Sequence, residues 1–300
     1  MSAASSASKS GASKPAPVTA ESLRSGKSGG DENFPVASLL IAAPLRPVIL
    51  AFYDFVRAGD DVADHPSLPP EQKHALLDQL DQSLIGESDA EPLGVRLRAK
   101  LAERGLTDDH ARDLLDAFRR DVDKSRYENW DELIDYCRLS AMPVGRFLLD
   151  VHGESSDLWP ASDAICAALQ INNHLQDCGK DFRAIDRVYV PRDALQAAGA
   201  RVEELGADKA SPALRACLRG LALRNRALLE AGQSLPHRIA DLRLGMEIAV
   251  VTRHAFSIVD LLIARDPLSE TVKLSKSQAL SGAAFAAAGE AFSRLTRRAA

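Results

Sequence analysis

Helical periodicity dominates this 300-residue chain from residue 35 onward. Nearly every segment there repeats its apolar residues at helical spacing or has a helix-forming composition, and alternating β-branched runs are missing. The pattern predicts helices at residues 46–64, 71–85, 90–104, 107–122, 130–153, 161–180, 209–232, 237–265 and 274–297, and a short extended segment at 187–191. We therefore expect an all-α fold with a single domain spanning residues 31–300.

Residues 1–30 differ from the rest of the chain because Ser, Ala and Gly dominate them and no apolar period is present. Such a segment cannot bury a core, so we expect a disordered tail. It lacks the apolar region of a secretory signal. Its basic, Ser-rich and acid-poor composition leaves a transit peptide as the alternative.

Charge and cysteine usage narrow the function classes. The formal net charge of −5 argues against nucleic acid as a partner. The four cysteines occur singly, without a CxxC pair, which fits a reducing, cytoplasmic setting. No transmembrane helix is expected, because the most apolar stretch, residues 246–264, contains Arg253, His254 and Asp260.

The last predicted helix, residues 274–297, is rich in Ala and carries Phe285, Phe292 and Leu295. We expect it to pack on the domain. Peripheral contact with a membrane is the alternative, and it would suit a very apolar product.

Two acidic segments stand out against this helical background. In the first, Asp60 and Asp64 are four residues apart, and Asp61 lies beside them. Helical steps back from Asp60 meet Val56 and Ile49, so these acids continue a face that is otherwise apolar. Carboxylates on such a face are costly to bury unless they bind something polar.

The second segment repeats the arrangement about a hundred residues later. Asn173, Asp177 and Asp181 lie four apart in series, with Gln170 one turn earlier on the same apolar helix. Spacing alone does not decide the function, because residues 107–116 also carry acids at helical spacing. There the acids lie among Arg112, Arg119 and Arg120 on a face that should be solvated.

Acids that converge on one cavity repel each other by roughly 4 kcal/mol per close pair at an effective dielectric near 20. They would therefore take up protons or bind a divalent cation. Oxygen-only ligands favour Mg²⁺, which typically bridges to substrate phosphates. The alternative, that both segments are charged helix ends, stays open from the residues alone.

The order of these segments resembles the squalene/phytoene synthase family over residues 32–265. The motifs that carry the resemblance are RPVILAFYDFVRAGDDVAD at 46–64, YCRLSAMPVG at 136–145, QDCGKD at 176–181 and RVYVP at 187–191. Within the family, residues 32–38, 126–133 and 172–177 are most similar to the bacterial hydroxysqualene synthases of hopanoid biosynthesis.

The resemblance implies an all-α isoprenoid synthase fold with a central cavity between the two acidic helices. It implies Mg²⁺ as the cofactor and a prenyl diphosphate as the substrate. The expected metal ligands are Asp60, Asp61, Asp64, Asp177 and Asp181. Family members often carry an acid where this chain has Lys180. The second helix therefore either binds its metal with fewer carboxylates or uses Asn173 as a neutral oxygen ligand.

The resemblance also assigns roles to individual side chains. Arg46, Arg57 and Arg187 match positions expected to bind diphosphate, and Tyr136 matches the family's active-site tyrosine. Simpler interpretations stay open: Arg57 pairs with an acid four residues on, Tyr136 belongs to the core, and Arg46 is surface charge.

The implied reaction converts presqualene diphosphate and water to hydroxysqualene and diphosphate. Asp60 and Asp177 would act in catalysis with the metal. The polar residues expected to position the water are Tyr136, Gln170 and Asn173. The apolar wall is expected to contain Phe34, Phe52, Phe55, Val144, Phe147, Leu148 and Leu169.

Two other functions remain. A head-to-head synthase that makes presqualene diphosphate, dehydrosqualene or phytoene would use the same acids. A catalytically silent scaffold protein is a more distant alternative, because such a protein would be expected to lose some of the metal acids. The implied pathway predicts functional coupling to a presqualene diphosphate synthase and to a hydroxysqualene reductase.

Overall fold

The structure is a computed structural model that describes residues 19–23 and 41–299, and in these ranges it contains helices and no extended strand. The helices are α1 (Arg46–Ala63), α2 (Pro70–Ile85), α3 (Pro92–Ala102), α4 (Asp109–Asp123), α5 (Trp130–Ser140), α6 (Met142–Val151), α7 (Trp159–Ile185), α8 (Arg192–Ala198), α9 (Pro212–Gly232), α10 (Leu235–Arg238), α11 (Leu242–Ala264) and α12 (Lys276–Ala299). Short 3₁₀ turns occur at Glu21–Leu23, Ala43–Leu45, Ser156–Leu158 and Val202–Gly206. The predicted all-α fold is confirmed.

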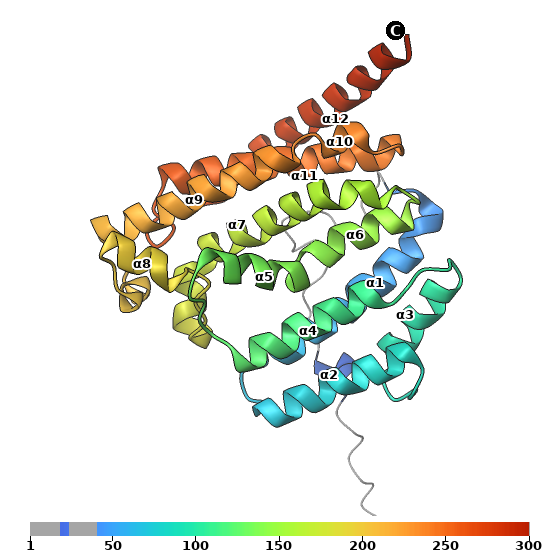
Figure 1. Cartoon of the computed structure of the whole chain (residues 1–300), viewed down its shortest axis with the longest axis horizontal. Helices are drawn as coiled ribbons and strands as arrows, with labels where there is room; N and C mark the ends of the chain where they lie inside the picture. The colour runs from blue at the N-terminus through green and yellow to red at the C-terminus, as the bar shows by residue number, and fades with distance from the viewer. Residues whose placement is uncertain (1–18, 24–40, 300) are drawn as a thin grey trace, which may run out of the picture.

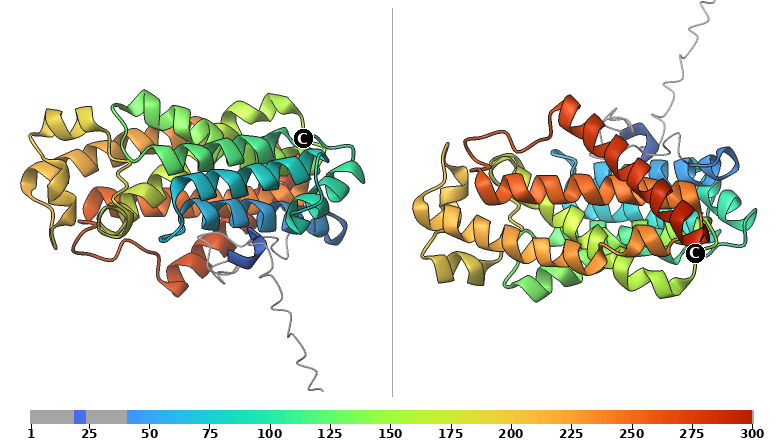
Figure 2. Two further views of the ribbon diagram at one scale, coloured as in Figure 1. Left: turned by 90° about the horizontal axis from the view of Figure 1, so that it is seen from below. Right: turned by 90° about the horizontal axis from the view of Figure 1, so that it is seen from above.

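The helices form two groups with separate apolar cores (Figure 1). Helices α1 to α4 enclose one core around residues such as Phe55, Leu80 and Leu115. Helices α5, α7, α9 and α11 enclose the second core, which contains Leu175 and Val259. Helix α12 crosses the outer side of α11, as two further views show (Figure 2). The long helices α1 and α7, which carry the acidic segments, therefore belong to different groups.

Two predicted helices are each divided in the structure. The helix expected at 130–153 is interrupted at Ala141, where α6 begins with Met142-Pro143. Proline is accommodated in the first turn of a helix but not in its interior, because it has no N–H. The helix expected at 237–265 is likewise divided before Asp241, whose side chain accepts a hydrogen bond of 2.8 Å from the Leu244 amide and caps α11.

The extended segment predicted at 187–191 is confirmed near its start. Val188 forms an isolated parallel bridge with Arg126, and its amide donates to the Ser125 carbonyl at 2.9 Å. This pairing ties the end of α7 to the loop between α4 and α5. It positions Arg187 and Tyr189 at the junction of the two helix groups.

Five residues of the segment predicted to be a disordered tail are described, and one of them, Ala20, is packed against the domain. Glu21–Leu23 form a 3₁₀ turn, and Ala20, immediately before it, is fully buried. The Ala20 amide donates a 2.7 Å hydrogen bond to the Glu91 carboxylate. Composition did not predict this docking, because it depends on one specific contact. The rest of residues 1–30 lies outside the described residues.

Candidate active site

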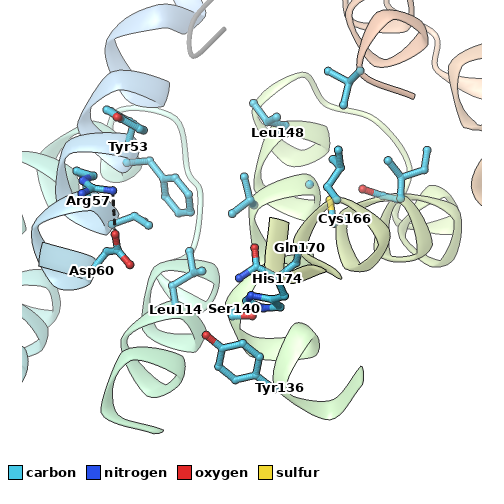
Figure 3. Close-up of a pocket in the computed structure, with 18 of the residues that line it drawn as sticks. Tyr53, Arg57, Asp60, Leu114, Tyr136, Ser140, Leu148, Cys166, Gln170 and His174 are labelled. Atoms are coloured by element: carbon cyan, nitrogen blue, oxygen red, sulfur yellow. Dashed lines mark ion pairs between the residues drawn. The ribbon is translucent and has the colours of Figure 1, made fainter. Parts of the chain in front are cut away.

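A cavity of about 410 Å³ lies between the two helix groups, lined by residues of α1, α4, α5, α6, α7 and α11 (Figure 3). Its wall is largely apolar, and Phe52, Val144, Leu148 and Leu169 line it as predicted. Two other predicted wall residues, Phe55 and Phe147, are buried in the core behind the wall. The Phe147 ring stacks on the Phe52 ring with a centroid distance of 3.8 Å. Phe34 lies outside the described residues.

Two of the three acids predicted at the end of α1 lie on this cavity. Asp60 and Asp64 line it, whereas Asp61 is buried beside them and does not. Arg57 forms ion pairs with Asp60 at 2.9 Å and with Asp61 at 2.6 Å. The simple interpretation of Arg57 as a partner of an acid four residues on is therefore confirmed. Arg57 also lines the cavity, so the same guanidinium that pairs with the acids of α1 is available to a ligand bound there.

Helix α7 faces α1 across the cavity and presents Gln170, His174 and Asp181 to it. Asn173 and Asp177 are not among the lining residues. Successive residues of a helix are rotated by about 100°, so Asn173 points to a different side from His174. Asp177 is nevertheless close enough to Asp181 to influence its protonation. The roles assigned to Asn173 and Asp177 stay predictions.

Of the three predicted diphosphate-binding arginines, two reach the cavity. Arg187 lines it, although only 9% of its surface is exposed, and it binds Asp64 at 2.7 Å and the Asp121 carbonyl at 3.0 Å. Arg46 does not line the cavity, and its Nε donates to the Ile41 carbonyl at 3.1 Å, at the start of α1.

Sequence reasoning missed Asp121, which lines the cavity from the end of α4. It accepts hydrogen bonds from Tyr136 Oη at 2.6 Å and from Tyr189 Oη at 3.2 Å. The signal was present, because helical steps back from Asp121 meet the buried residues Phe118 and Leu114. The same test that singled out Asp60 would have found it.

Burial and mutual repulsion raise the affinity of these acids for protons. Burial, with the Asp64 carboxylate next in importance, raises the pKa of Asp60 to about 7. Burial and the neighbouring Asp177 raise the pKa of Asp181 to about 6, and burial raises that of Asp121 to about 6. Carboxylates in this condition gain stability from any cation that neutralises them.

The chemistry of the donors fits a hard divalent cation. Asp60 and Asp64 line the cavity at the end of α1, and Asp181 lines it from α7. Among the described residues, no three His, Cys, Asp or Glu side chains form a ready-made metal cluster. Mg²⁺ is typically bound by one or two carboxylates together with water and substrate phosphates, so paired rather than clustered acids suit it.

Family membership follows from comparison with known proteins. Residues 28–278 match the squalene/phytoene synthase family, and the chain belongs to it. It is 59% identical to a hydroxysqualene synthase from Rhodopseudomonas palustris over 257 residues, which cover 86% of this chain and 88% of that protein. It is 51% identical to a hydroxysqualene synthase from Zymomonas mobilis over 92% of this chain and 94% of the relative.

Solved structures agree on the fold. A squalene synthase HpnC from Alicyclobacillus acidocaldarius superposes with a TM-score of 0.67 at 33% identity, over 75% of this chain and 85% of that one. A dehydrosqualene synthase superposes with a TM-score of 0.71 at 20% identity, over 82% and 87% of the two chains. The second likeness concerns the fold alone.

Proposed function

We propose that this protein is a hydroxysqualene synthase that converts presqualene diphosphate and water to hydroxysqualene and diphosphate. Relatives at 51% and 59% identity that carry this name support the proposal. The observation that carries it is one cavity with an apolar wall and, at one end, carboxylates and two arginines. Such a cavity suits a long hydrocarbon whose head is a diphosphate.

The acidic end would hold the diphosphate through Mg²⁺, with Asp60, Asp64 and Asp181 at the cavity and Asp177 beside them. Bound Mg²⁺ would supply neutralisation of the charge that develops on the leaving diphosphate. Arg57 and Arg187 add positive charge at the same end. Asp61, a predicted ligand, would instead orient Arg57 through their 2.6 Å ion pair.

The aromatic residues beside the acids suit the cation that remains after the diphosphate departs. Tyr136, Tyr189 and His174 line the cavity, and their rings lie within 3.5–6.0 Å of one another. Aromatic faces attract positive charge. Burial raises the pKa of both phenols well above its ordinary value, so these tyrosines stay neutral and donate to Asp121.

We also propose that α12 contacts the membrane in which so apolar a product accumulates. No helix within residues 19–23 and 41–299 has the length and apolar character needed to cross a bilayer. The outer side of α12 carries Leu280, Phe285, Phe292 and Leu295, each at least 68% exposed. Replacing Phe285 and Phe292 by Ser should reduce flotation with lipid vesicles, whereas Leu223→Ser on α9 should leave it unchanged.

Coupling to enzymes of neighbouring steps belongs to the same proposal. A presqualene diphosphate synthase would supply the substrate, and a hydroxysqualene reductase would consume the product. Transfer between such enzymes keeps an apolar intermediate out of water.

Product identification by mass spectrometry tests the assignment. Purified protein with Mg²⁺ is given presqualene diphosphate and, separately, farnesyl diphosphate. Hydroxysqualene from the first and no product from the second is expected. A condensed product from farnesyl diphosphate would instead identify a head-to-head synthase. A folded protein that is inactive with both substrates would favour a scaffold role.

A further inference from the structure

His174 stands at the boundary between the apolar and acidic parts of the cavity. It lines the cavity from α7, one helical turn after Gln170. Asp181 lies seven residues farther along the same helix, about 10 Å at 1.5 Å per residue. In the other direction α7 contributes the apolar residues Ile165 and Leu169. A diphosphate held by the acids would therefore place the carbon that bears it close to His174.

Neighbouring aromatic rings fix the imidazole in place. It stacks on Tyr189 with a centroid distance of 3.5 Å and an interplanar angle of 15°. The Tyr136 ring lies 6.0 Å away on another side. Both phenols donate hydrogen bonds to Asp121. Within the described part of the chain, the ring is thus held mainly by packing against these aromatic neighbours.

The imidazole nevertheless has a buried polar atom to satisfy. His174 is only 8% exposed, and its Nε2 atom has no hydrogen-bond partner among the described residues. Leaving such an atom unpaired costs about 1–3 kcal/mol. A buried, unpaired nitrogen in the wall of a ligand cavity indicates that something polar binds there.

A second unpaired polar atom lies in the same wall. Ser140 lines the cavity one helical turn after Tyr136, and its Oγ is also buried without a partner among the described residues. Figure 3 draws Ser140 and His174 in the part of the cavity that also holds Tyr136. A buried water needs two to four polar partners, and these two atoms can supply two of them.

We propose that His174, assisted by Ser140, holds the water molecule that captures the carbocation. This inference rests on the proposed hydroxysqualene synthase function and names the groups responsible for water capture. His174 Nε2 accepts a hydrogen bond from the water and leaves an oxygen lone pair directed at the cation.

The chemical step balances without a further reactant. Heterolysis of the C–O bond leaves the electron pair on diphosphate and a cation on the carbon beside the cyclopropane ring. Rearrangement then opens the ring, the C–C bonds that break supplying the electrons of the bond that forms, and leaves the cation on an open chain. The water oxygen forms a new C–O bond, and the resulting oxonium gives one proton to Nε2. That proton passes on to the departing diphosphate. No electrons are exchanged with an oxidant or reductant.

The state of the ring agrees with this role. Burial, with the nearby Arg187 guanidinium as the second cause, lowers the pKa of His174 to about 3. The resting imidazole is therefore neutral, and a neutral ring can accept a hydrogen bond at Nε2. An oxonium is a far stronger acid than the imidazolium, so the proton transfer remains downhill.

Two variants separate this role from a purely structural one. His174→Phe keeps a ring that can stack on Tyr189 but removes the acceptor, and His174→Gln restores one. The assay supplies presqualene diphosphate and Mg²⁺ and measures both diphosphate release and hydroxysqualene. For His174→Phe we expect diphosphate release to continue while hydroxysqualene per diphosphate falls by about tenfold, with eliminated or rearranged hydrocarbons in its place. His174→Gln should restore most of the alcohol.

Three results with the His174 variants would overturn the inference. Unchanged hydroxysqualene per diphosphate in His174→Phe would show that Nε2 does not hold the water, and equal loss of diphosphate release and alcohol would indicate a structural role. Failure of His174→Gln to restore the alcohol would have the same consequence. If His174→Phe does not fold by circular dichroism, Ser140→Ala takes its place, with a reduced alcohol fraction expected and an unchanged one contradicting the inference. Wild-type protein that forms no hydroxysqualene would instead refute the proposed function itself.

Discussion

Tyr136 Oη donates a hydrogen bond of 2.6 Å to Asp121 Oδ2 and thereby joins α5 to the end of α4 at the cavity. The residue expected to position water thus has its hydroxyl engaged by an acid that the sequence did not single out. Tyr189 donates to the same carboxylate at 3.2 Å, and Arg187 binds the Asp121 carbonyl. Asp121 therefore organises the polar side of the site through three partners.

The Tyr136–Asp121 hydrogen bond should contribute measurably to stability. Tyr136→Phe removes a donor to a largely buried carboxylate, which typically costs about 1.5–3 kcal/mol. Urea unfolding of Tyr136→Phe, Asp121→Asn and the double variant would give the coupling energy between the two residues. Strictly additive effects would mean that the hydrogen bond does not stabilise the fold.

Asp60 should be needed for turnover and not for folding. Asp60→Asn is expected to lower Mg²⁺-dependent turnover by about 100-fold or more, since it weakens the site that neutralises the leaving group. Helical circular dichroism should stay intact, because removing this charge relieves repulsion with Asp64. The matched control is Asp116→Asn on α4, an exposed acid paired with Arg119 at 2.8 Å, which should change neither property. Loss of helicity in Asp60→Asn would make this acid structural.

Gly145 should not tolerate a side chain. A Cβ at this position of α6 would lie 2.3 Å from Ser162 Oγ and 2.5 Å from Cys166 Sγ, both on α7. We expect Gly145→Ala to destabilise the protein by about 1–3 kcal/mol through overpacking. Gly220→Ala on α9 is the matched control: nothing lies within 4 Å of its Cβ, so a gain of about 0.5–1 kcal/mol is expected. Thermal unfolding distinguishes the two, and equal effects would contradict the close contact between α6 and α7.

Glu91 should make stability depend on pH. Its side chain is fully buried, and burial raises its pKa above the ordinary value, with Glu21 adding to the rise. Between its unfolded and folded pKa values the native state binds more protons than the unfolded chain, so this contribution to stability falls as pH rises through that window. It is fully present only below the unfolded pKa, near 4.3.

Glu91→Gln tests this dependence, because Gln retains an oxygen that can accept from the Ala20 amide. Denaturant unfolding at each pH gives the free energy of unfolding of the variant minus that of wild type. This difference should be more favourable to the variant at pH 7 than at pH 4. Glu87→Gln, at an exposed position, provides the control. Its difference from wild type in free energy of unfolding should be the same at both pH values. A Glu91→Gln effect that does not vary with pH would refute the assignment.

Helical phase was enough to predict part of the site. Asp60, Asp64 and Asp181 line the cavity, and the turns that precede Asp60 and Asp181 carry buried residues such as Phe52 and Leu175. Asp61 also follows the buried turns of α1, but Arg57 engages it, and an ion pair of this kind depends on side-chain rotamers that the spacing does not determine. The break at Ala141 could have been inferred from Pro143, whereas the docking of Ala20 on Glu91 could not.

His174 illustrates what periodicity leaves out. Its position on α7 was visible in the sequence, but its importance depends on Tyr189 and Tyr136, which reach it from a loop and from another helix. An unpaired Nε2 is a property of the packed structure and not of any sequence window. Contacts between distant segments therefore decide which polar residues of an acidic helix face the substrate.

In the proposed reaction, solvent water captures the cation formed at the junction of the acidic and apolar parts of the cavity. The most direct test is turnover of presqualene diphosphate in water enriched in ¹⁸O, with mass analysis of the alcohol and of the diphosphate. We expect one ¹⁸O atom in hydroxysqualene and none in the released diphosphate. Unlabelled alcohol together with labelled diphosphate would show cleavage at phosphorus and would rule out capture of a carbocation by water.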